Sequence, residues 1–463
     1  MHGFVRLAVV SALILFALAP AAAQSVPQSR EQITLSYAPL VKAVAPAVVN
    51  IYTKRRVARQ RGNFLFDDPV FKRLFGGFTR QRVEKSLGSG VILRADGLIV
   101  TNNHVIDKAE EIRVVLSDRR EFAAMIVLAD KRTDIAVLRI DTVGLQLPFL
   151  VLGDSDRLEV GDLVLAVGNP FGVGQTVTNG IVSALARTSI GVSDFRSFIQ
   201  TDAAINPGNS GGALVAMDGK LVGVNTAIFS RNGGSLGIGF AVPSNMVRRI
   251  LASAVSGKPL VRPWLGFTGK PVTVEIASSL GLERPVGVLI EMVRRNGPAK
   301  LAGLRPGDVV VAVGRYDVDD VQALRFSVAT RPIGEAVTFK VIRRAKVLKL
   351  TFDLVVPPED PPRNLTLLHG RNPFAGATVA NLSPALGAEL GIEDELSGVM
   401  VLKIEPGSTA ARLGFRPRDI IRAVNGEPIA RVRDLDAIVS RRQRDWRIIL
   451  RRGGRDIGFE VSG

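Results

Sequence analysis

Residues 206–212 read Asn206-Pro207-Gly208-Asn209-Ser210-Gly211-Gly212, and this turn has the makings of a nucleophilic site. A serine hydroxyl is a poor nucleophile unless a base takes its proton, and the oxyanion formed by its attack needs hydrogen-bond donors. Glycines on both sides of Ser210 permit backbone dihedrals that direct successive N–H groups toward one place. The turn is therefore a candidate nucleophile with its own oxyanion hole.

The base that Ser210 needs can be sought among only three histidines. His2 lies in the N-terminal apolar segment and His369 in a polar linker, which leaves His104 at the end of an apolar run typical of a buried strand. Asp134 opens another β-rich run thirty residues further on. A carboxylate there could hold the imidazole in the required tautomer and stabilise the imidazolium.

Two fold classes fit the serine turn, because residues 208–212 also match the G-x-S-x-G pattern of α/β-hydrolases. In that class the serine lies between a strand and a helix, and the triad runs serine, acid, histidine. Here a polar turn precedes Ser210, and residues 213–224 are typical of a β-hairpin with an Asp218-Gly219 turn. The order His104, Asp134, Ser210 is that of the chymotrypsin class. The sequence therefore predicts a mainly β protein with a chymotrypsin-like double β-barrel.

At this point the residues resemble the HtrA/Deg family of serine proteases, also called trypsin-like protease Do. The likeness covers nearly the whole chain after the N-terminal segment. It rests on ordered blocks at residues 88–92, 101–105, 133–138, 167–172, 200–212 and 237–243. The resemblance implies His104 as general base, Asp134 as its orienting acid and Ser210 as nucleophile. It also implies an oxyanion hole formed by the backbone N–H groups of Gly208, Asn209 and Ser210, and an ATP-independent endoprotease that degrades unfolded or misfolded proteins.

The residues near the nucleophile predict which side chain the protease accepts at the cleavage site. Cleavage after Lys or Arg would need an acid six residues before the nucleophile in the trypsin pattern, and that position is Ala204. Ala204 and Ile205, next to Ile228, predict a small apolar pocket. We therefore expect cleavage after Val, Ala, Leu or Ile in unfolded chains.

The N-terminal segment and the composition bear on localisation and cofactors. Residues 1–23 place His2 and Arg6 before an apolar run and end in Ala21-Ala22-Ala23, which predicts a signal peptide cleaved after Ala23 and export to the periplasm. The 463-residue chain has no cysteine, so it forms no disulfides and has no thiol ligands. Three scattered histidines offer no zinc cluster, and we expect no metal and no cofactor.

The net charge of +17 is partly concentrated between residues 54 and 85, where ten basic side chains face three acidic ones. This pattern predicts a solvated basic insertion loop, with peripheral contact to an anionic membrane as a secondary role. Binding to nucleic acid is not expected, because no nucleic-acid fold signature accompanies the charge.

The C-terminal part of the chain repeats itself, since residues 297–310 align with residues 408–421 at an offset of 111. The repeated motif resembles that of PDZ domains, which bind extended peptides at a sheet edge and capture their C-termini with backbone N–H groups. We call the two units the first and second copy. The expected organisation is a signal peptide (1–23), an N-terminal segment leading into the first barrel strand (24–53), the basic insertion (54–87), the rest of the protease domain (88–258), the first copy (262–356), a stiff extended linker (357–372) and the second copy (373–463).

By the same resemblance, each copy has a carboxylate-binding loop. The loop is Trp264-Leu265-Gly266-Phe267 in the first copy, and Phe374-Ala375-Gly376-Ala377 is the weaker candidate in the second. Two turn residues depart from the PDZ pattern, Arg315 after Gly314 and Arg418 before Asp419. At the end of the protease domain, residues 245–255 predict a helix, with Ser244 as its N-cap and Gly257 as its stop.

The family resemblance also implies homotrimers that can form larger assemblies, and loops that rearrange on activation. The candidate assembly contacts are aromatic residues near the N-terminus: Tyr37, Phe64, Phe66, Phe71 and Phe78. The candidate activation segments are residues 187–198 and 228–237. An alternative of a different class stays open, a holdase chaperone or PDZ adaptor with little proteolysis.

Overall fold

The computed structural model of the chain describes residues 36–56, 83–169, 174–187, 198–228, 235–314, 316–392, 397–441 and 443–462. The chain divides into two compact units, Met1–Lys258 and Pro259–Gly463. The predicted signal peptide lies outside the described residues. So do Phe64, Phe66, Phe71 and Phe78 and most of both predicted activation segments.

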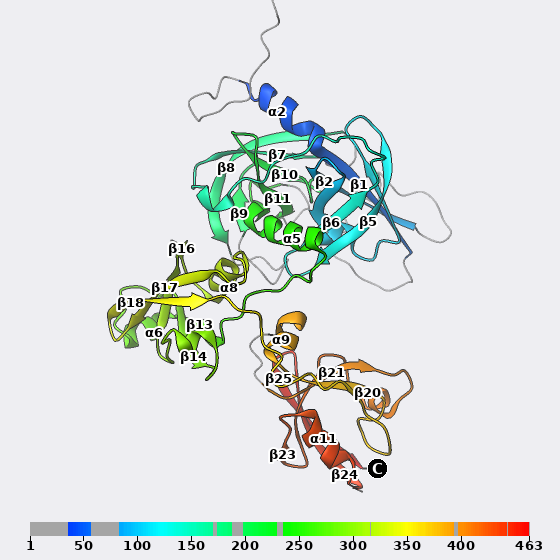
Figure 1. Cartoon of the computed structure of the whole chain (residues 1–463), viewed down its shortest axis with the longest axis vertical. Coiled ribbons are helices and arrows are strands. Elements are labelled where there is room, and N and C mark those ends of the chain that lie inside the picture. The colour runs from blue at the N-terminus through cyan, green and yellow to red at the C-terminus, as the bar shows by residue number, and fades with distance from the viewer. Residues whose placement is uncertain are drawn as a thin grey trace, which may run out of the picture. The chain divides into compact units, whose positions relative to one another are not determined.

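The first unit contains two closed six-stranded barrels. Their strands are drawn in blue to green in Figure 1. The strands of the first barrel are β1 (Val48–Arg56), β2 (Val83–Arg94), β3 (Leu98–Asn102), β4 (Glu111–Val115), β5 (Glu121–Asp130) and β6 (Ile135–Ile140). Their order around the barrel is β1-β2-β3-β6-β5-β4, with every pair antiparallel. Strand β3 is buried throughout, because its two faces both lie against packed protein.

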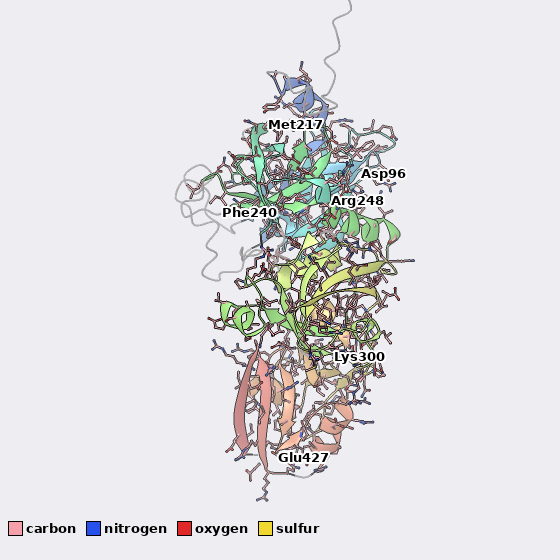
Figure 2. The ribbon with its side chains drawn as sticks, turned by 90° about the vertical axis from the view of Figure 1, so that its left-hand side faces the viewer. Asp96, Met217, Phe240, Arg248, Lys300 and Glu427 are labelled. Carbon is pink, nitrogen blue, oxygen red and sulfur yellow. The ribbon has the colours of Figure 1, made fainter. Side chains whose placement is uncertain are left out.

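The second barrel has the same design. Its strands are β7 (Leu163–Gly168), β8 (Thr176–Arg187), β9 (Phe198–Thr201), β10 (Ala213–Ala216), β11 (Leu221–Ile228) and β12 (Gly239–Pro243). They close in the order β10-β11-β12-β9-β8-β7. Strands β10 and β11 form the expected hairpin, with Gly219 at φ +79° in its turn. Within this barrel the rings of Phe198 and Phe240 are 6.2 Å apart; Figure 2 labels Phe240. The predicted mainly β, double-barrel fold is confirmed.

Short helices join and close the barrels. They are α2 (Ala38–Val44), η2 (Ala45–Ala47), α4 (Asn103–Ile106), η3 (Ser155–Arg157) and α5 (Ser244–Ser256). Helix α5 contacts β6 of the first barrel and β11 of the second, so it braces both. Arg248 on α5, labelled in Figure 2, donates from Nη2 to the Gly153 carbonyl at 2.7 Å.

The prediction that Ser244 is the N-cap of this helix is wrong. Pro243 is the capping residue and Ser244 is the first helical one. The Ser244 hydroxyl donates instead to the Gly153 carbonyl at 2.9 Å, because its side chain is buried against that loop. Gly257 ends the helix in the left-handed conformation, at φ +66°, as expected for a stop.

The second unit holds two sheets of related topology. The first copy consists of β13 (Phe267–Pro271), α6 (Val274–Ser279), β14 (Val288–Val293), α7 (Pro298–Leu301), β15 (Val309–Val313), β16 (Tyr316–Asp317), α8 (Val321–Ala329), β17 (Ala336–Arg343) and β18 (Lys346–Asp353). Its strand order is β13-β14-β15-β17-β18, with β16 paired to β15.

The second copy repeats this order with one strand more. It consists of β19 (Thr366–Leu367), β20 (Ala377–Asn381), α9 (Pro384–Leu390), β21 (Val399–Ile404), α10 (Thr409–Arg412), β22 (Ile420–Val424), β23 (Glu427–Pro428), α11 (Val432–Val439), β24 (Asp445–Arg452) and β25 (Arg455–Ser462). The order is β19-β20-β21-β22-β24-β25, with β23 paired to β22. Strand β19 lies inside the range expected to be a linker (357–372).

In each copy, one buried carboxylate joins two segments that are distant in the sequence. The Asp308 side chain is 1% exposed and accepts two hydrogen bonds of 2.7 Å from Arg343, one at each carboxylate oxygen. This hydrogen bonding raises the pKa of the Arg343 guanidinium. Asp419 and Arg452 repeat the arrangement, also at 2.7 Å. The aspartate of the repeated motif therefore ties the turn before β15 or β22 to the end of a distant strand.

We expect Asp308→Asn to destabilise the second unit by about 3 kcal/mol, because breaking a buried ion pair leaves the remaining charge without its partner. Thermal unfolding of the purified protein measures this loss. Glu460→Gln is the matched control, since its ion pair with Arg447 is 70% exposed and exposed pairs contribute less than about 1 kcal/mol. Equal destabilisation by the two variants would contradict the stabilising role of the Asp308–Arg343 ion pair.

Candidate active site

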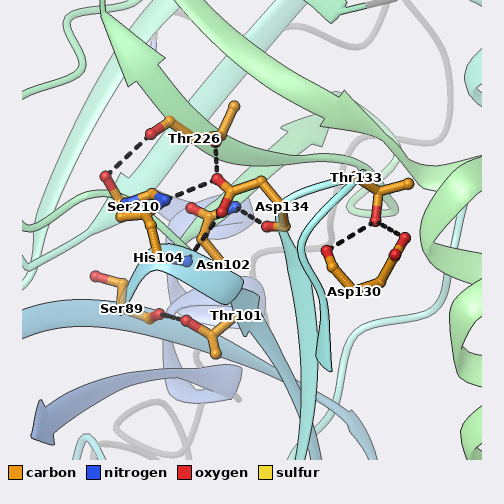
Figure 3. Close-up of polar contacts among 9 residues, drawn as sticks. All are labelled: Ser89, Thr101, Asn102, His104, Asp130, Thr133, Asp134, Ser210 and Thr226. Atoms are coloured by element: carbon orange, nitrogen blue, oxygen red, sulfur yellow. Dashed lines mark hydrogen bonds and ion pairs between the residues drawn. The ribbon is translucent and has the colours of Figure 1, made fainter. Parts of the chain in front are cut away.

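Strand pairing in the first barrel brings His104 and Asp134 together. His104 lies in α4, directly after β3, and Asp134 immediately precedes β6, which pairs with β3 through Asn102 and Ile135. The His104 backbone N–H donates to Asp134 Oδ1 at 2.9 Å, and ring atom Nδ1 lies 2.7 Å from Oδ2 (Figure 3). A carboxylate only accepts hydrogen bonds, so this contact places the ring proton on Nδ1 and leaves Nε2 free to accept one.

The Asp134 carboxylate is fixed from both barrels. Its side chain is 5% exposed, and its backbone has a φ of +58°, which aspartate tolerates better than most residues. Thr226 of β11 donates from Oγ1 to Asp134 Oδ2 at 2.6 Å. The buried Asn102 side chain donates to the Asp134 carbonyl at 3.0 Å. Together these bonds hold the carboxylate oriented toward the imidazole.

Thr226 was not found by sequence reasoning. It is the residue skipped when the β11–β12 register shifts between Asn225 and Ala227, so it lies at an irregularity of the strand. Such bulges redirect side chains and are frequent beside active sites. Its hydroxyl reaches Asp134, while its carbonyl accepts a hydrogen bond from Ser210 Oγ at 3.2 Å. No local sequence signal marks a bulge of this kind.

Ser210 is linked to His104 through Thr226 and Asp134, as the dashed lines in Figure 3 show. Within the described residues its Oγ forms a hydrogen bond with the Thr226 carbonyl and none with the His104 ring. Catalytic hydrogen bonds are often long or poorly aligned without substrate and tighten in the complex. The three residues predicted from the sequence are therefore in one place, with the serine hydroxyl hydrogen-bonded to Thr226.

The turn before Ser210 presents two backbone donors. Gly208 has φ +101°, and the N–H groups of Gly208 and Ser210 donate to no partner within the described part of the chain. The prediction that Asn209 also supplies its N–H is wrong, because this N–H donates to the Asn206 carbonyl at 2.9 Å and closes the turn. Two donors, from Gly208 and Ser210, remain to stabilise an oxyanion.

Ser89 of the first barrel clamps this turn. It is fully buried, and its Oγ donates to the Gly208 carbonyl at 2.7 Å while accepting from the Asn169 N–H at 2.9 Å. Its backbone N–H donates to the Ser210 carbonyl at 2.8 Å. Gly211, at φ +85°, allows this approach, because a Cβ there would lie 2.1 Å from the Ser89 carbonyl oxygen. Ser89 belongs to a block quoted in the family resemblance, but its contacts were not predicted.

The predicted pocket residues have different environments. Ala204 is partly exposed, and its carbonyl accepts a hydrogen bond from Thr178 at 2.9 Å. Ile205 is 1% exposed and belongs to the core of the second barrel, where it packs close to Gly239. The side chain of Ile228 lies outside the described side chains. The preference for small apolar residues stays a prediction.

The two predicted peptide loops have matching backbone geometry. Gly266 has φ +75° and its carbonyl accepts from the Arg294 N–H at 2.8 Å; Gly376 has φ +86° and accepts from Glu405 at 2.9 Å. The carbonyl of Leu265 likewise accepts from Ala299 at 3.2 Å. Ala375 repeats this contact, accepting from Ala410 at 3.1 Å. The two loops are therefore equivalent residue by residue, at an offset of 110.

Neither a metal-ion site nor a membrane-spanning helix is found among the described residues. No group of three or more His, Cys, Asp or Glu side chains is arranged to hold a metal ion there. None of the helices in this described part is long and apolar enough to cross a membrane.

Two closed barrels that carry a His–Asp pair, a serine and a turn with free backbone donors define the class of trypsin-like peptidases. We call this turn, residues 206–212, the oxyanion turn. Accordingly, residues 88–224 match the trypsin-like peptidase domain, and residues 234–354 and 400–452 match PDZ domains. The chain is 35% identical to the periplasmic serine endoprotease DegP of Salmonella typhimurium, over 95% of both chains. It is 34% identical to DegP of Escherichia coli K12, over 96% of both.

A solved structure described as the HtrA-type protease AlgW with a decapeptide is 45% identical, covers 70% of this chain and 99% of its own, and has a TM-score of 0.51. The chain belongs to the HtrA/DegP family of periplasmic serine endoproteases, and its C-terminal copies are PDZ domains.

We expect Ser89→Ala to lower kcat at least 10-fold with little change in KM, because the Gly208 carbonyl loses the donor that orients the oxyanion turn. Thr101→Val is the matched control. Thr101 is equally buried and donates a 2.7 Å hydrogen bond to the Ser89 carbonyl, but none to residues 208–210. Steady-state kinetics on an unfolded substrate, with Tm measured for both variants, provide the comparison. Equal kcat for the two variants at similar Tm would contradict the clamp.

Proposed function

We propose that the endoprotease acts by acyl-enzyme chemistry with His104, Asp134 and Ser210 as its triad. The observation that carries this proposal is the 2.7 Å contact between His104 Nδ1 and Asp134 Oδ2 beside Ser210. Nε2 takes the proton of the Ser210 hydroxyl as Oγ attacks the scissile carbonyl, and later delivers it to the leaving amine. Asp134 keeps the ring tautomer and stabilises the imidazolium.

The oxyanion of the tetrahedral intermediate is held, in this proposal, by the N–H groups of Gly208 and Ser210. Each such donor contributes about 10²–10³ to the rate in related chemistry. Because the donors belong to one turn clamped by Ser89, their orientation needs no change as the charge develops. The partly exposed Ala204 supports cleavage after small aliphatic residues. An extended chain is needed to enter such a cleft, which favours unfolded polypeptides as substrates.

We propose that the first PDZ domain captures substrate C-termini at the loop Trp264-Leu265-Gly266-Phe267. The left-handed Gly266 and the strand β13 that follows provide backbone N–H groups and a sheet edge, the two elements used in this mode of recognition. We also propose assembly as homotrimers or larger oligomers through the N-terminal segment, where Tyr37 precedes α2. Contact of the basic insertion with anionic membranes stays a prediction from charge.

The triad is tested with a fluorophosphonate probe, which reacts with an activated serine. Wild-type enzyme should be labelled at Ser210, and Ser210→Ala should lose both the label and proteolysis, by roughly 10³-fold or more. Ser256→Ala, at the end of α5, is the control and should be labelled like wild type. Labelling of Ser210→Ala at wild-type rate would assign the nucleophile elsewhere.

Specificity is tested by sequencing the products of denatured casein. The small apolar position at Ala204 predicts that most cleavages follow Val, Ala, Leu or Ile. Cleavage mainly after Lys or Arg would contradict the pocket assignment, because no acid stands at this position to pair with a basic side chain.

A further inference from the structure

In the second PDZ domain a strand lies along the outer edge of β20, where the described part of the first domain has none. β19 pairs antiparallel with β20, with Thr366 opposite Val379 and Leu367 opposite Thr378. In the first PDZ domain, β13 is the equivalent of β20, and no described strand pairs with its outer edge. PDZ domains bind peptides by adding an antiparallel strand at this edge. β19 therefore lies where a bound peptide would lie.

The backbone contacts of Leu368 continue this likeness into the loop. Its N–H donates to the Ala377 carbonyl at 2.9 Å, and its carbonyl accepts from the Gly376 N–H at 2.9 Å. Gly376 is the counterpart of Gly266 and is the glycine of the carboxylate-binding loop. The Leu368 carbonyl thus accepts from a donor that would otherwise face the terminal carboxylate of a peptide.

The Leu368 side chain fills apolar space in the same domain. It is 2% exposed and belongs to one hydrophobic cluster with Phe374, Val379 of β20, and Val432 and Leu435 of α11. A C-terminal side chain of a bound peptide would be anchored between the corresponding strand and helix.

The first PDZ domain differs at the corresponding positions. Trp264, the counterpart of Phe374, and Val321, the counterpart of Val432, are only partly buried, whereas Phe374 is 0% and Val432 1% exposed. Two of the apolar positions around Leu368 in the second domain are therefore partly open to solvent in the first, whereas Leu324, the counterpart of Leu435, is 2% exposed there.

We propose that the peptide groove of the second PDZ domain is occupied by residues 366–368 of the same chain. While residues 366–368 occupy this groove, a peptide with an apolar C-terminal residue binds only the first PDZ domain. The second groove takes such a peptide when residues 366–368 are displaced. The proposal rests on the peptide capture proposed above for the first domain.

The short covalent connection between residues 366–368 and the groove favours their binding over that of a free peptide. Only five residues separate Leu368 from Phe374, and two hydrogen bonds of Asn372 fold them into a turn, to the His369 carbonyl at 2.8 Å and from the Phe374 N–H at 3.0 Å. A segment tethered so closely has an effective concentration in the millimolar range or above. A free peptide at micromolar concentration competes poorly against it.

The test counts binding sites on the full-length Ser210→Ala protein, which does not cut the probe. The probe is a fluorescent ten-residue peptide ending in valine, titrated by calorimetry and anisotropy. We expect one site per chain. Leu368→Asp should open a second site, because the charged side chain is expelled from the apolar cluster. Leu365→Asp is the matched control, since Leu365 is 63% exposed on the same segment, and it should keep one site.

A further pair of variants assigns the sites. Phe267→Asp in the first PDZ domain should abolish binding, and the double variant Phe267→Asp, Leu368→Asp should regain one site. Two sites on the parent protein, or no site on a folded double variant, would overturn the proposal. Absence of binding to both the parent and folded Leu368→Asp proteins would instead overturn the proposed capture by the first domain.

Amide hydrogen exchange tests the same point without altering residue 368. Saturating peptide should increase protection at residues 264–268 and leave residues 374–378 unchanged, because their partners are already in place. New protection at residues 374–378 at micromolar peptide would overturn the proposal even if the Leu368→Asp protein failed to fold.

Discussion

The hydrogen bond from Thr226 to Asp134 joins the two barrels at the proposed catalytic site. Asp134 belongs to the first barrel with His104, whereas Thr226 belongs to the second barrel with Ser210. A buried carboxylate must have its charge satisfied by donors, and this one receives them from both sides. The geometry of the site therefore depends on the packing of one barrel against the other, which helix α5 braces by contacting strands of each.

The oxyanion turn depends on the same interface. Its glycines give it the freedom to direct N–H groups, but that freedom must be removed for the donors to be preorganised. Ser89, a residue of the first barrel, restricts this freedom by donating hydrogen bonds to the carbonyls of Gly208 and Ser210. The proposed base and the proposed oxyanion donors are thus positioned across one boundary, so a change in barrel packing would alter both.

The sequence pointed to His104, Asp134 and Ser210, which the structure brings together, because few residues of the chain meet the requirements of a proposed triad. Histidine scarcity left His104 as the only base within the β-rich region, and chain order distinguished the two serine hydrolase folds. Thr226 and Ser89 were missed because their roles arise from barrel closure and from a bulge, neither of which leaves a pattern in neighbouring residues. Asn209 was misassigned for a similar reason, since the partner of a backbone N–H in a turn depends on the dihedrals actually adopted.

The C-terminal repeat was predictable from self-similarity, but the difference between its copies was not. Residues 357–362 consist of proline and acidic residues, and this composition predicted a linker. The strand Thr366–Leu367 that follows is too short to show the alternation typical of a strand. Its place on the sheet edge depends on contacts with residues of β20.

The claim that the two barrels jointly hold the catalytic carboxylate is tested most directly by the rate at which a fluorophosphonate acylates Ser210. Thr226→Val removes one hydroxyl at nearly constant volume, and Thr226→Ser restores it. The account predicts that acylation slows at least about 10-fold in Thr226→Val, equivalent to about 1.4 kcal/mol, and stays near the wild-type rate in Thr226→Ser. An unchanged rate in a folded Thr226→Val protein would contradict it.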